Sequence, residues 1–183
     1  MTENDRMQLK VIGFLLEYPD AAWMNALAGL DGVVAALEDG RGRQALRRFL
    51  GYAGGTPGIR LQETYTAAFD LNPSASLNLS YHLMGDSEDR GKALAGLLGV
   101  YHREGYDVAA GELPDYLPMV LEFLSVCPEP EGADLLWSCL GKVSTLAAHL
   151  EEEGHPYAGL LGLAADILRG RGCGTPSAAE KEA

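Results

Sequence analysis

The sequence predicts an all-α protein, a single-domain helical bundle without a β-sheet. The chain has 183 residues, a length that fits one domain. Leu and Ala together number 53, whereas the β-branched residues Val and Ile number 11. This ratio favours helices, because β-branched side chains lose rotamer freedom against the preceding helical turn. In addition, apolar residues recur three and four positions apart through most of the chain, which is the spacing of amphipathic helices.

The first expected helices occupy residues 5–18 and 21–38. The helix at 5–18 ends before Pro19, because a residue that precedes proline disfavours the helical conformation. Its apolar face consists of Val11, Phe14, Leu15 and Tyr18. Residues 21–38 predict one or two short helices around Trp23, with Asp31–Gly32 as a possible break.

A turn at residues 39–44 precedes a helix to about Tyr52, and Thr56–Pro57 opens the next helix. One face of that helix carries Leu61, Tyr65, Ala68 and Phe69. Residues 70–76, with the sequence DLNPSAS, are expected to form a loop because of their Asp, Asn, Pro and Ser content. Residues 77–85 are apolar, and they leave a short helix and an extended segment as open alternatives.

Four more helices are expected in the second half of the chain. Asp86 is a suitable N-cap for a helix that runs to about Glu104. The stretch GELPDYLPMVLEFL, residues 111–124, begins the next helix, and CPEPEG at 127–132 ends it. The last helix occupies residues 155–170. The helix between these two is marked by Leu136, Leu140, Val143 and Leu150.

Residues 1–169 are therefore expected to form one helical domain, and residues 170–183 a disordered tail rich in Gly, Ser, Ala and charges. The longest apolar run, residues 157–165, is too short to span a bilayer. The three cysteines form no C-x-x-C pair, and no apolar signal segment precedes the domain. These features predict a soluble protein of the reducing cytoplasm, in which Cys127 and Cys139 are small core residues.

The formal net charge of −12, from 26 acidic and 14 basic residues, indicates the kind of partner. An acidic surface repels phosphate backbones and anionic lipid headgroups, so nucleic acids and membrane surfaces are poor candidates. A basic partner is favoured, although a net charge also serves solubility alone. The one basic cluster is expected to be a solvated helix face, and it consists of Arg41, Arg43, Arg47 and Arg48.

No catalytic apparatus and no metal-binding arrangement can be argued from the residues. The sequence GRGRQA at 40–45 matches a G-x-G-x-x-A pattern, but a dinucleotide site needs a preceding strand. Glu152 and His155 have the spacing of di-iron bundles, which require a second such pair and two further carboxylates. Gly154 and Pro156 indicate that the helix ends between the two candidate ligands.

The stretch GELPDYLPMVLEFL places two prolines, Pro114 and Pro118, at the start of a strongly apolar helix. With Asp115 as N-cap, Pro118 falls in the first helical turn, where an N–H has no intrahelical partner. The Asp115 carboxylate would then accept from the N–H of Leu117. A rigid helix start explains much of this pattern. The crowding of polar and aromatic groups around Tyr116 also fits the lip of a binding groove.

Two long stretches resemble a known family. They are ETYTAAFDLNPSASLNLSYHLMGDSEDRGKALAGL and, further along, ELPDYLPMVLEFL. Both resemble the NarJ-type chaperones of respiratory nitrate reductase, which belong to the wider TorD-like group of redox-enzyme maturation proteins. The resemblance is dense over residues 62–124 and weaker at 15–20 and 155–161.

The wider TorD-like group carries an E-P-D-H signature that is altered in this chain. Leu113 is inserted after the glutamate, and a tyrosine stands where the histidine would be. This departure is typical of the nitrate reductase branch, and it puts any histidine-dependent role in doubt. The residues that stand in place of the signature are Glu112, Pro114, Asp115 and Tyr116.

The resemblance implies an all-helical, cofactor-free chaperone that binds the N-terminal segment of the nitrate reductase catalytic (alpha) subunit in the cytoplasm. It would hold that subunit open during insertion of the molybdenum cofactor. The family's target segment is basic and amphipathic, which suits an acidic protein with an apolar groove. A monomer or a weak dimer is expected. The expected peptide-binding residues are Tyr65, Phe69, Tyr81, Glu112, Pro114, Asp115, Tyr116, Leu117 and Pro118.

Two alternatives stay open from the sequence. One is a chaperone of the same fold for another molybdoenzyme, such as a dimethyl sulfoxide or trimethylamine oxide reductase. The other, from a different functional class, is a helical enzyme with an unrecognised metal site. Metal analysis of the purified protein would distinguish the second, because a chaperone of this type requires no stoichiometric metal.

Overall fold

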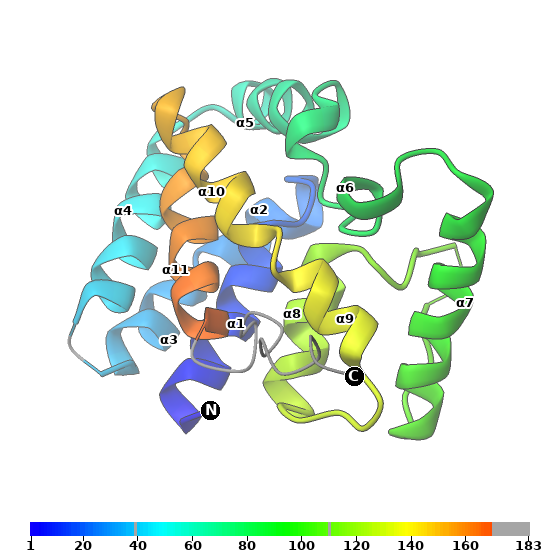
Figure 1. The fold of residues 1–183 in the computed structure, drawn as a ribbon. Helices are drawn as coiled ribbons and strands as arrows, with labels where there is room; N and C mark the ends of the chain where they lie inside the picture. Colours follow the sequence, from blue (N-terminus) through cyan, green and yellow to red (C-terminus); the bar gives the residue numbers. More distant parts are fainter. Residues whose placement is uncertain (39, 110, 170–183) are drawn as a thin grey trace, which may run out of the picture.

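The computed structural model describes the whole chain except residues 39, 110 and 170–183, and the described part is a bundle of helices (Figure 1). Every regular element in this part is helical, and its only pairing of extended backbone is an isolated bridge between Asn78 and Tyr116. The predicted all-α class is confirmed. The expected tail lies outside the described residues. No described helix is long and apolar enough to cross a membrane.

The helices follow one another with short connections, and two short turns of other helical types follow α5. These turns are a π-helical turn at Thr66–Asp70 and a 3₁₀ turn at Pro73–Ala75. The α-helices are α1 (Glu3–Leu15), α2 (Ala21–Leu27), α3 (Leu30–Ala36), α4 (Arg41–Gly55), α5 (Gly58–Tyr65), α6 (Tyr81–Met84), α7 (Glu88–Arg103), α8 (Leu117–Val126), α9 (Asp134–Leu140), α10 (Val143–Glu152) and α11 (Ala158–Arg169).

Besides shifts of a few residues at other helix ends, three boundaries differ in kind from those expected from the sequence. Helices α2 and α3 separate at Ala28–Gly29, and Asp31–Gly32 lies inside α3. The N-cap of α7 is Ser87 and not Asp86. The single helix expected between residues 133 and 152 is divided into α9 and α10 at Gly141–Lys142. Both breaks contain a backbone hydrogen bond to the carbonyl three residues back, which tightens and ends the preceding helix.

For residues 77–85 the sequence left a short helix and an extended segment as alternatives, and the segment contains both. Asn78 is extended and pairs with Tyr116, whereas Tyr81–Met84 form the short helix α6. A backbone bridge therefore joins this segment to the residues immediately before α8. This connection determines the geometry of the site described below.

Helices α1 and α8 pack against each other in antiparallel directions at the centre of the bundle (Figure 1). Near one end of the pair, Arg6 Nε donates to the carbonyl of Ser125 at 2.6 Å. Near the other end Gly13 faces Pro118, and a Cβ at Gly13 would lie 2.8 Å from the Pro118 carbonyl oxygen. Glycine is therefore required at position 13 for the two backbones to approach so closely.

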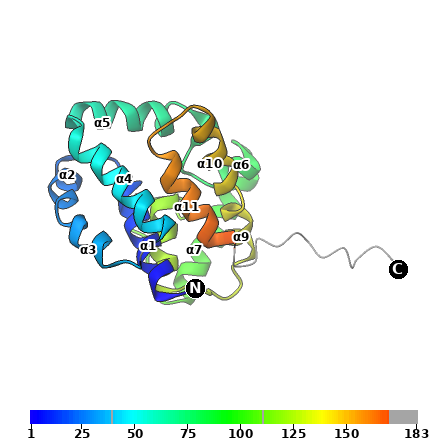
Figure 2. The same ribbon diagram turned by 90° about the vertical axis from the view of Figure 1, so that its left-hand side faces the viewer.

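On the other side of α1, helices α10 and α11 form a second closely packed pair, and α11 also contacts α4 and α1 (Figure 2). One hydrophobic core joins all these helices. At its centre Tyr157, which immediately precedes α11, is completely buried. Its ring lies 4.8 Å from that of Phe49 and 5.1 Å from that of Phe69, measured between centroids. The aromatic side chains of α4 and of the segment after α5 thus belong to the core.

Candidate functional site

The residues before α8 form a buried junction with the segment 77–81 and with Arg90 of α7, which we call the Asp115 junction. Two backbone hydrogen bonds hold its two chain segments together. The N–H of Leu79 donates to the carbonyl of Asp115 at 3.0 Å, and the N–H of Leu117 donates to the carbonyl of Leu77 at 2.8 Å. These bonds connect the chain between α5 and α7 to the start of the central helix.

The Asp115 carboxylate is completely buried at the centre of this junction. Its Oδ2 atom accepts from the Ser80 hydroxyl at 2.6 Å and from the Ser80 N–H at 3.0 Å. The Arg90 guanidinium lies 3.6 Å from the same oxygen and also donates to the Ser80 hydroxyl at 3.0 Å. A buried carboxylate needs such donors and a nearby cation, because desolvation otherwise disfavours its charge.

The expected role of Asp115 as N-cap of α8 is therefore wrong. The N-cap is Tyr116, and it makes no side-chain capping bond. The reason is that the N–H of Leu117, which Asp115 was expected to cap, already donates to the carbonyl of Leu77. The Asp115 side chain is thereby available to Ser80. Pro118 nevertheless falls in the first turn of α8, as predicted.

Tyr116 connects the junction to the end of α1 through a chain of hydroxyl groups. Its hydroxyl lies 3.0 Å from that of Tyr65, which in turn donates to the carbonyl of Leu16 at 3.0 Å. The Tyr116 hydroxyl also donates to Glu17 Oε2 at 3.3 Å. Burial raises the pKa of both tyrosines well above the ordinary value, so both hydroxyls keep their protons at neutral pH.

The structure brings most of the predicted site residues together, but it buries the majority of them. Tyr65 and Phe69 share a face as predicted, with ring centroids 5.0 Å apart, and that face belongs to the core. Tyr81 is half-buried, with the guanidinium of Arg90 5.9 Å above its ring. Tyr116 is also half-buried, and Glu112 is exposed. The buried members of the set are Tyr65, Phe69, Pro114, Asp115, Leu117 and Pro118.

The expectation that Asp115 stands on an exposed groove lip is consequently wrong. Binding of a peptide by the predicted residues stays a prediction, in which only Tyr81, Glu112 and Tyr116 offer accessible surface. The sequence also gave no reason to select Ser80 or Arg90. Both lie within the family-like stretch LNLSYHLMGDSEDR, and that resemblance was the only signal that could have found them.

An open surface lies beside α8, next to the Asp115 junction, and we call it the α8 surface. It encloses a depression of about 240 Å³ with a mainly apolar floor and two carboxylates. The Tyr106 side chain is 40% exposed, and its ring lies 5.5 Å from that of the buried Phe123. The α8 surface consists of Tyr101, Tyr106, Asp107, Val108, Met119, Glu122, Phe123 and Val126.

Three carboxylates gather where the α8 surface meets Tyr116. Partial burial raises the pKa of Glu17, and the neighbouring carboxylates of Glu112 and Glu122 raise it further. The hydrogen bond from Tyr116 acts in the opposite direction. Carboxylates that raise the pKa of Glu17 by repulsion also create a locally negative potential around it. A cationic side chain placed there would relieve this repulsion.

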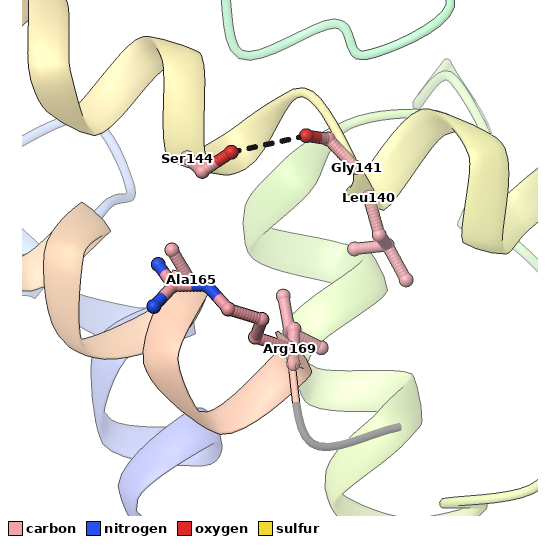
Figure 3. Close-up of a pocket in the computed structure, with 6 residues that line it drawn as sticks. Leu140, Gly141, Ser144, Ala165 and Arg169 are labelled. Atoms are coloured by element: carbon pink, nitrogen blue, oxygen red, sulfur yellow. Dashed lines mark hydrogen bonds between the residues drawn. The ribbon is translucent and has the colours of Figure 1, made fainter. Parts of the chain in front are cut away.

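Further depressions in the described residues have a different character. One of about 300 Å³ lies where α9 and α10 meet the end of α11, and Arg169 is the only charged residue among the described residues that line it (Figure 3). Arg169 is paired with Asp166 at 3.2 Å. Another, of about 400 Å³, contains Arg41 and Arg48 of α4 together with two carboxylates of the opposite helices. Neither combines an apolar floor with a purely acidic edge.

The candidate ligand pair Glu152 and His155 and two of the cysteines have defined places in the fold. Helix α10 ends at Glu152, so the prediction that a helix ends between Glu152 and His155 is confirmed. Among the described residues, no group of three or more His, Cys, Asp or Glu side chains is arranged to hold a metal ion. Cys139 is a core residue as predicted, and burial raises its pKa to about 11. Cys127 is only half-buried.

Comparison with known proteins identifies the family. The profile of the nitrate reductase delta subunit family matches residues 35–161. The chain is 33% identical to the nitrate reductase molybdenum cofactor assembly chaperone NarJ of Escherichia coli (strain K12), over 86% of this chain and 67% of that protein. It is 28% identical to a Bacillus subtilis (strain 168) protein named "Probable nitrate reductase molybdenum cofactor assembly chaperone NarJ", over 87% of each.

A similar solved structure supports the same assignment. It is a crystal structure described as that of a redox enzyme maturation protein from Archaeoglobus fulgidus. The two folds agree with a TM-score of 0.63 at 25% sequence identity, over 90% of this chain and 93% of the other. The resemblance noted in the sequence is thereby confirmed over nearly the whole chain.

Proposed function

Since the chain belongs to the nitrate reductase delta subunit family, we propose that it is a cytoplasmic chaperone that assists molybdenum cofactor insertion into, and assembly of, a nitrate reductase. Relatives of 28% and 33% identity are named as such assembly chaperones. They are named as chaperones and not as catalysts, so this chain is not an enzyme. The further part of the proposal is that it acts by binding the N-terminal segment of the catalytic subunit.

The α8 surface is the observation that supports binding of such a segment. An apolar depression accepts the apolar face of an amphipathic peptide, and surrounding carboxylates attract its basic residues. Tyr106 and Phe123 offer aromatic contact area, which is enriched at binding sites because it costs little rotamer entropy. The net charge of −12 would add long-range attraction toward a basic partner.

The predicted site residues divide into two groups in this proposal. Glu112 and Tyr116 are accessible and interact with Glu17, as Glu122 of the α8 surface does, and Tyr81 is accessible on α6, so these three are candidates for direct contact. The buried residues would position that surface, because the Asp115 junction fixes the start of α8. We propose direct contact for the first group and a positioning role for the second.

Affinity capture tests the proposed partner. The tagged chain is expressed with the reductase subunits, and the catalytic subunit is expected to co-purify with it. Capture should be lost when the N-terminal segment of that subunit is replaced by a scrambled sequence of the same composition. Equal capture of the scrambled form would contradict binding through this segment. Capture of a different molybdoenzyme in place of nitrate reductase would overturn the proposed partner.

A further inference from the structure

The α8 surface does not end at α8 but continues across the start of α1. Val126 lines both the α8 surface and a second depression of about 250 Å³, which contains Met7 and Lys10. Met7 and Glu3 in turn line both this second depression and a third one of about 460 Å³ against α3. The three depressions are therefore adjacent and share lining residues, and we call this row of depressions the long groove.

The walls of the long groove are held by direct contacts between its elements. Arg6 of α1 donates to the carbonyl of Ser125 at the end of α8, at 2.6 Å. The backbone N–H that follows α3, that of Glu38, donates to the Asn4 side chain at 3.0 Å. Figure 1 shows the start of α1 between α3 and the end of α8, as these contacts require. The groove is thus formed on rigid helices.

Each part of the long groove presents a large apolar side chain to solvent. The exposed fractions are 40% for Tyr106, 44% for Val126, 42% for Met7 and 38% for Val33. Because these side chains follow one another along connected depressions, they form a single apolar track. An extended apolar track of this kind marks an interaction site more often than isolated apolar residues do.

The charges along the groove alternate in sign. Asp107 and Glu122 lie at the α8 end, and Glu3 and Glu38 lie at the α3 end. The middle depression contains the two basic residues Arg6 and Lys10, besides Glu3 at its border with the third. A segment that follows this groove would meet negative, then positive, then negative potential.

We infer that the long groove binds one continuous amphipathic segment of the partner, with basic residues at both ends, no basic residue in the middle, and apolar residues between them. This inference rests on the proposed function, and it adds the path and the charge register of the bound segment. The occupant follows from charge complementarity, because opposite charges across an interface select the register in which a partner binds. Apolar contacts along the track would supply most of the affinity.

Substitution of the exposed apolar residues tests the path. The variant Met7→Gln/Val126→Gln alters the groove, and Ile59→Gln/Leu71→Gln is its matched control, on α5 and directly after the π-helical turn, at the other end of the bundle (Figure 1). The probe is a fluorescent peptide with the sequence of the N-terminal segment of the catalytic subunit, titrated by anisotropy. The groove variant should bind the peptide about tenfold more weakly. The control should bind it like the unmodified chain.

A charge exchange tests the register. A peptide with lysine introduced at its middle should bind the unmodified chain about threefold more weakly than the original peptide does. The variant Lys10→Glu should remove or reverse this difference, because it replaces the repelling charge by an attracting one. The same exchange at Lys92, an exposed lysine of α7, is the control and should leave the difference unchanged.

The outcomes separate this inference from the proposed function. Equal peptide affinity of the groove variant and its control would overturn the long groove, and the chaperone assignment would stand. Capture of the catalytic subunit without binding of the peptide would overturn the occupant named here. If the chain captured no reductase subunit at all, the proposed function would fall first, and this inference with it.

Discussion

The two ends of α8 differ in almost every physical property. At its start, the buried Asp115 and Ser80 form a polar cluster with the half-buried Arg90. At its end, Phe123 and Val126 belong to an open apolar surface with carboxylates at its edge. One helix of ten residues thus connects a closed polar junction to an open apolar groove.

This difference shows that the polar residues of the motif around Asp115 have a structural role in the described conformation. The motif around Asp115 joins two chain segments, and the surface suited to a partner consists mainly of apolar side chains beside it. Changes at the start of α8 should therefore affect folding more than binding, and changes at its end should do the opposite. The following predictions test this division, from the largest expected effect to the smallest.

Removal of the Asp115 carboxylate should cause the largest loss of stability. Asp115→Ala would leave the Ser80 N–H and hydroxyl and the Arg90 guanidinium without their buried acceptor. Removing one partner of such a pair costs about 3 kcal/mol, well above the roughly 1 kcal/mol of a lost helix cap. Urea unfolding would measure this change, with Asp107→Ala as the control, because the Asp107 side chain is 97% exposed. A loss no larger than that of the control would contradict the structural role.

The close approach of α1 and α8 should be nearly as sensitive. Gly13→Ala would place a Cβ 2.8 Å from the Pro118 carbonyl oxygen, so the two helices must move apart, at a cost of about 1–3 kcal/mol. The matched control is Gly51→Ala inside α4, where a Cβ meets no other atom within 4 Å. That substitution should stabilise the protein by roughly 0.5–1 kcal/mol, because alanine favours a helix over glycine.

Opposite signs for these two Gly→Ala changes are the expected result of the same unfolding measurement. A stabilising effect at both positions would mean that α1 and α8 are not in close contact. A destabilising effect at both would mean that glycine serves some purpose in α4 other than packing. The first result would remove the packing argument that fixes α8 against α1, and the second would remove only its control.

The sequence predicted the elements better than it predicted their environment. The helices, the ends before Pro19 and before 127–132, and the shared face of Tyr65 and Phe69 follow from local periodicity and turn chemistry. The role of Asp115 does not follow from local sequence. Its expected partner, the N–H of Leu117, donates to the carbonyl of Leu77, which lies far away along the chain. Capping rules consider one helix at a time, and here a neighbouring segment supplies the acceptor.

The open surface was harder still to predict. Tyr106 and Val108 lie between two helices and follow no periodic pattern, so nothing in the sequence assigns them to a face. The sequence predicted a strongly apolar helix for α8, and most of its residues are buried. Which of its residues remain accessible depends on how α1 and residues 104–108 cover it, and this is a property of tertiary packing alone.

Salt should weaken peptide binding at the open end of α8, and this effect is smaller than those above. Raising the salt concentration from 0.1 M to 1 M shortens the Debye length from ~10 Å to ~3 Å, which screens exposed charges but not buried ones. Peptide binding at the acidic groove should therefore weaken about tenfold without vanishing, as calorimetric titration would show. Peptides with leucines replaced by serines should not bind at any salt concentration. Salt-independent affinity would mean that the acidic surface serves only solubility.

The smallest expected effect concerns Glu17, where the two regions meet. Burial and the carboxylates of Glu112 and Glu122 raise the pKa of Glu17 above its ordinary value of 4.5, so the folded state binds its proton more tightly than the unfolded state does. Stability must then fall as pH rises through the interval between the unfolded and the folded pKa, and the loss persists at neutral pH.

Glu17→Gln removes this loss, and its amide oxygen can still accept from Tyr116. Relative to the unmodified chain, the variant should gain less than about 1 kcal/mol at pH 7, and this gain should shrink as the pH falls below 4.5. Urea unfolding at both pH values would measure the gain, with Glu151→Gln, an exposed change on α10, as the control. A gain that did not depend on pH would show that Glu17 carries no electrostatic strain, and the acidic cluster beside Tyr116 would then offer a basic partner little attraction.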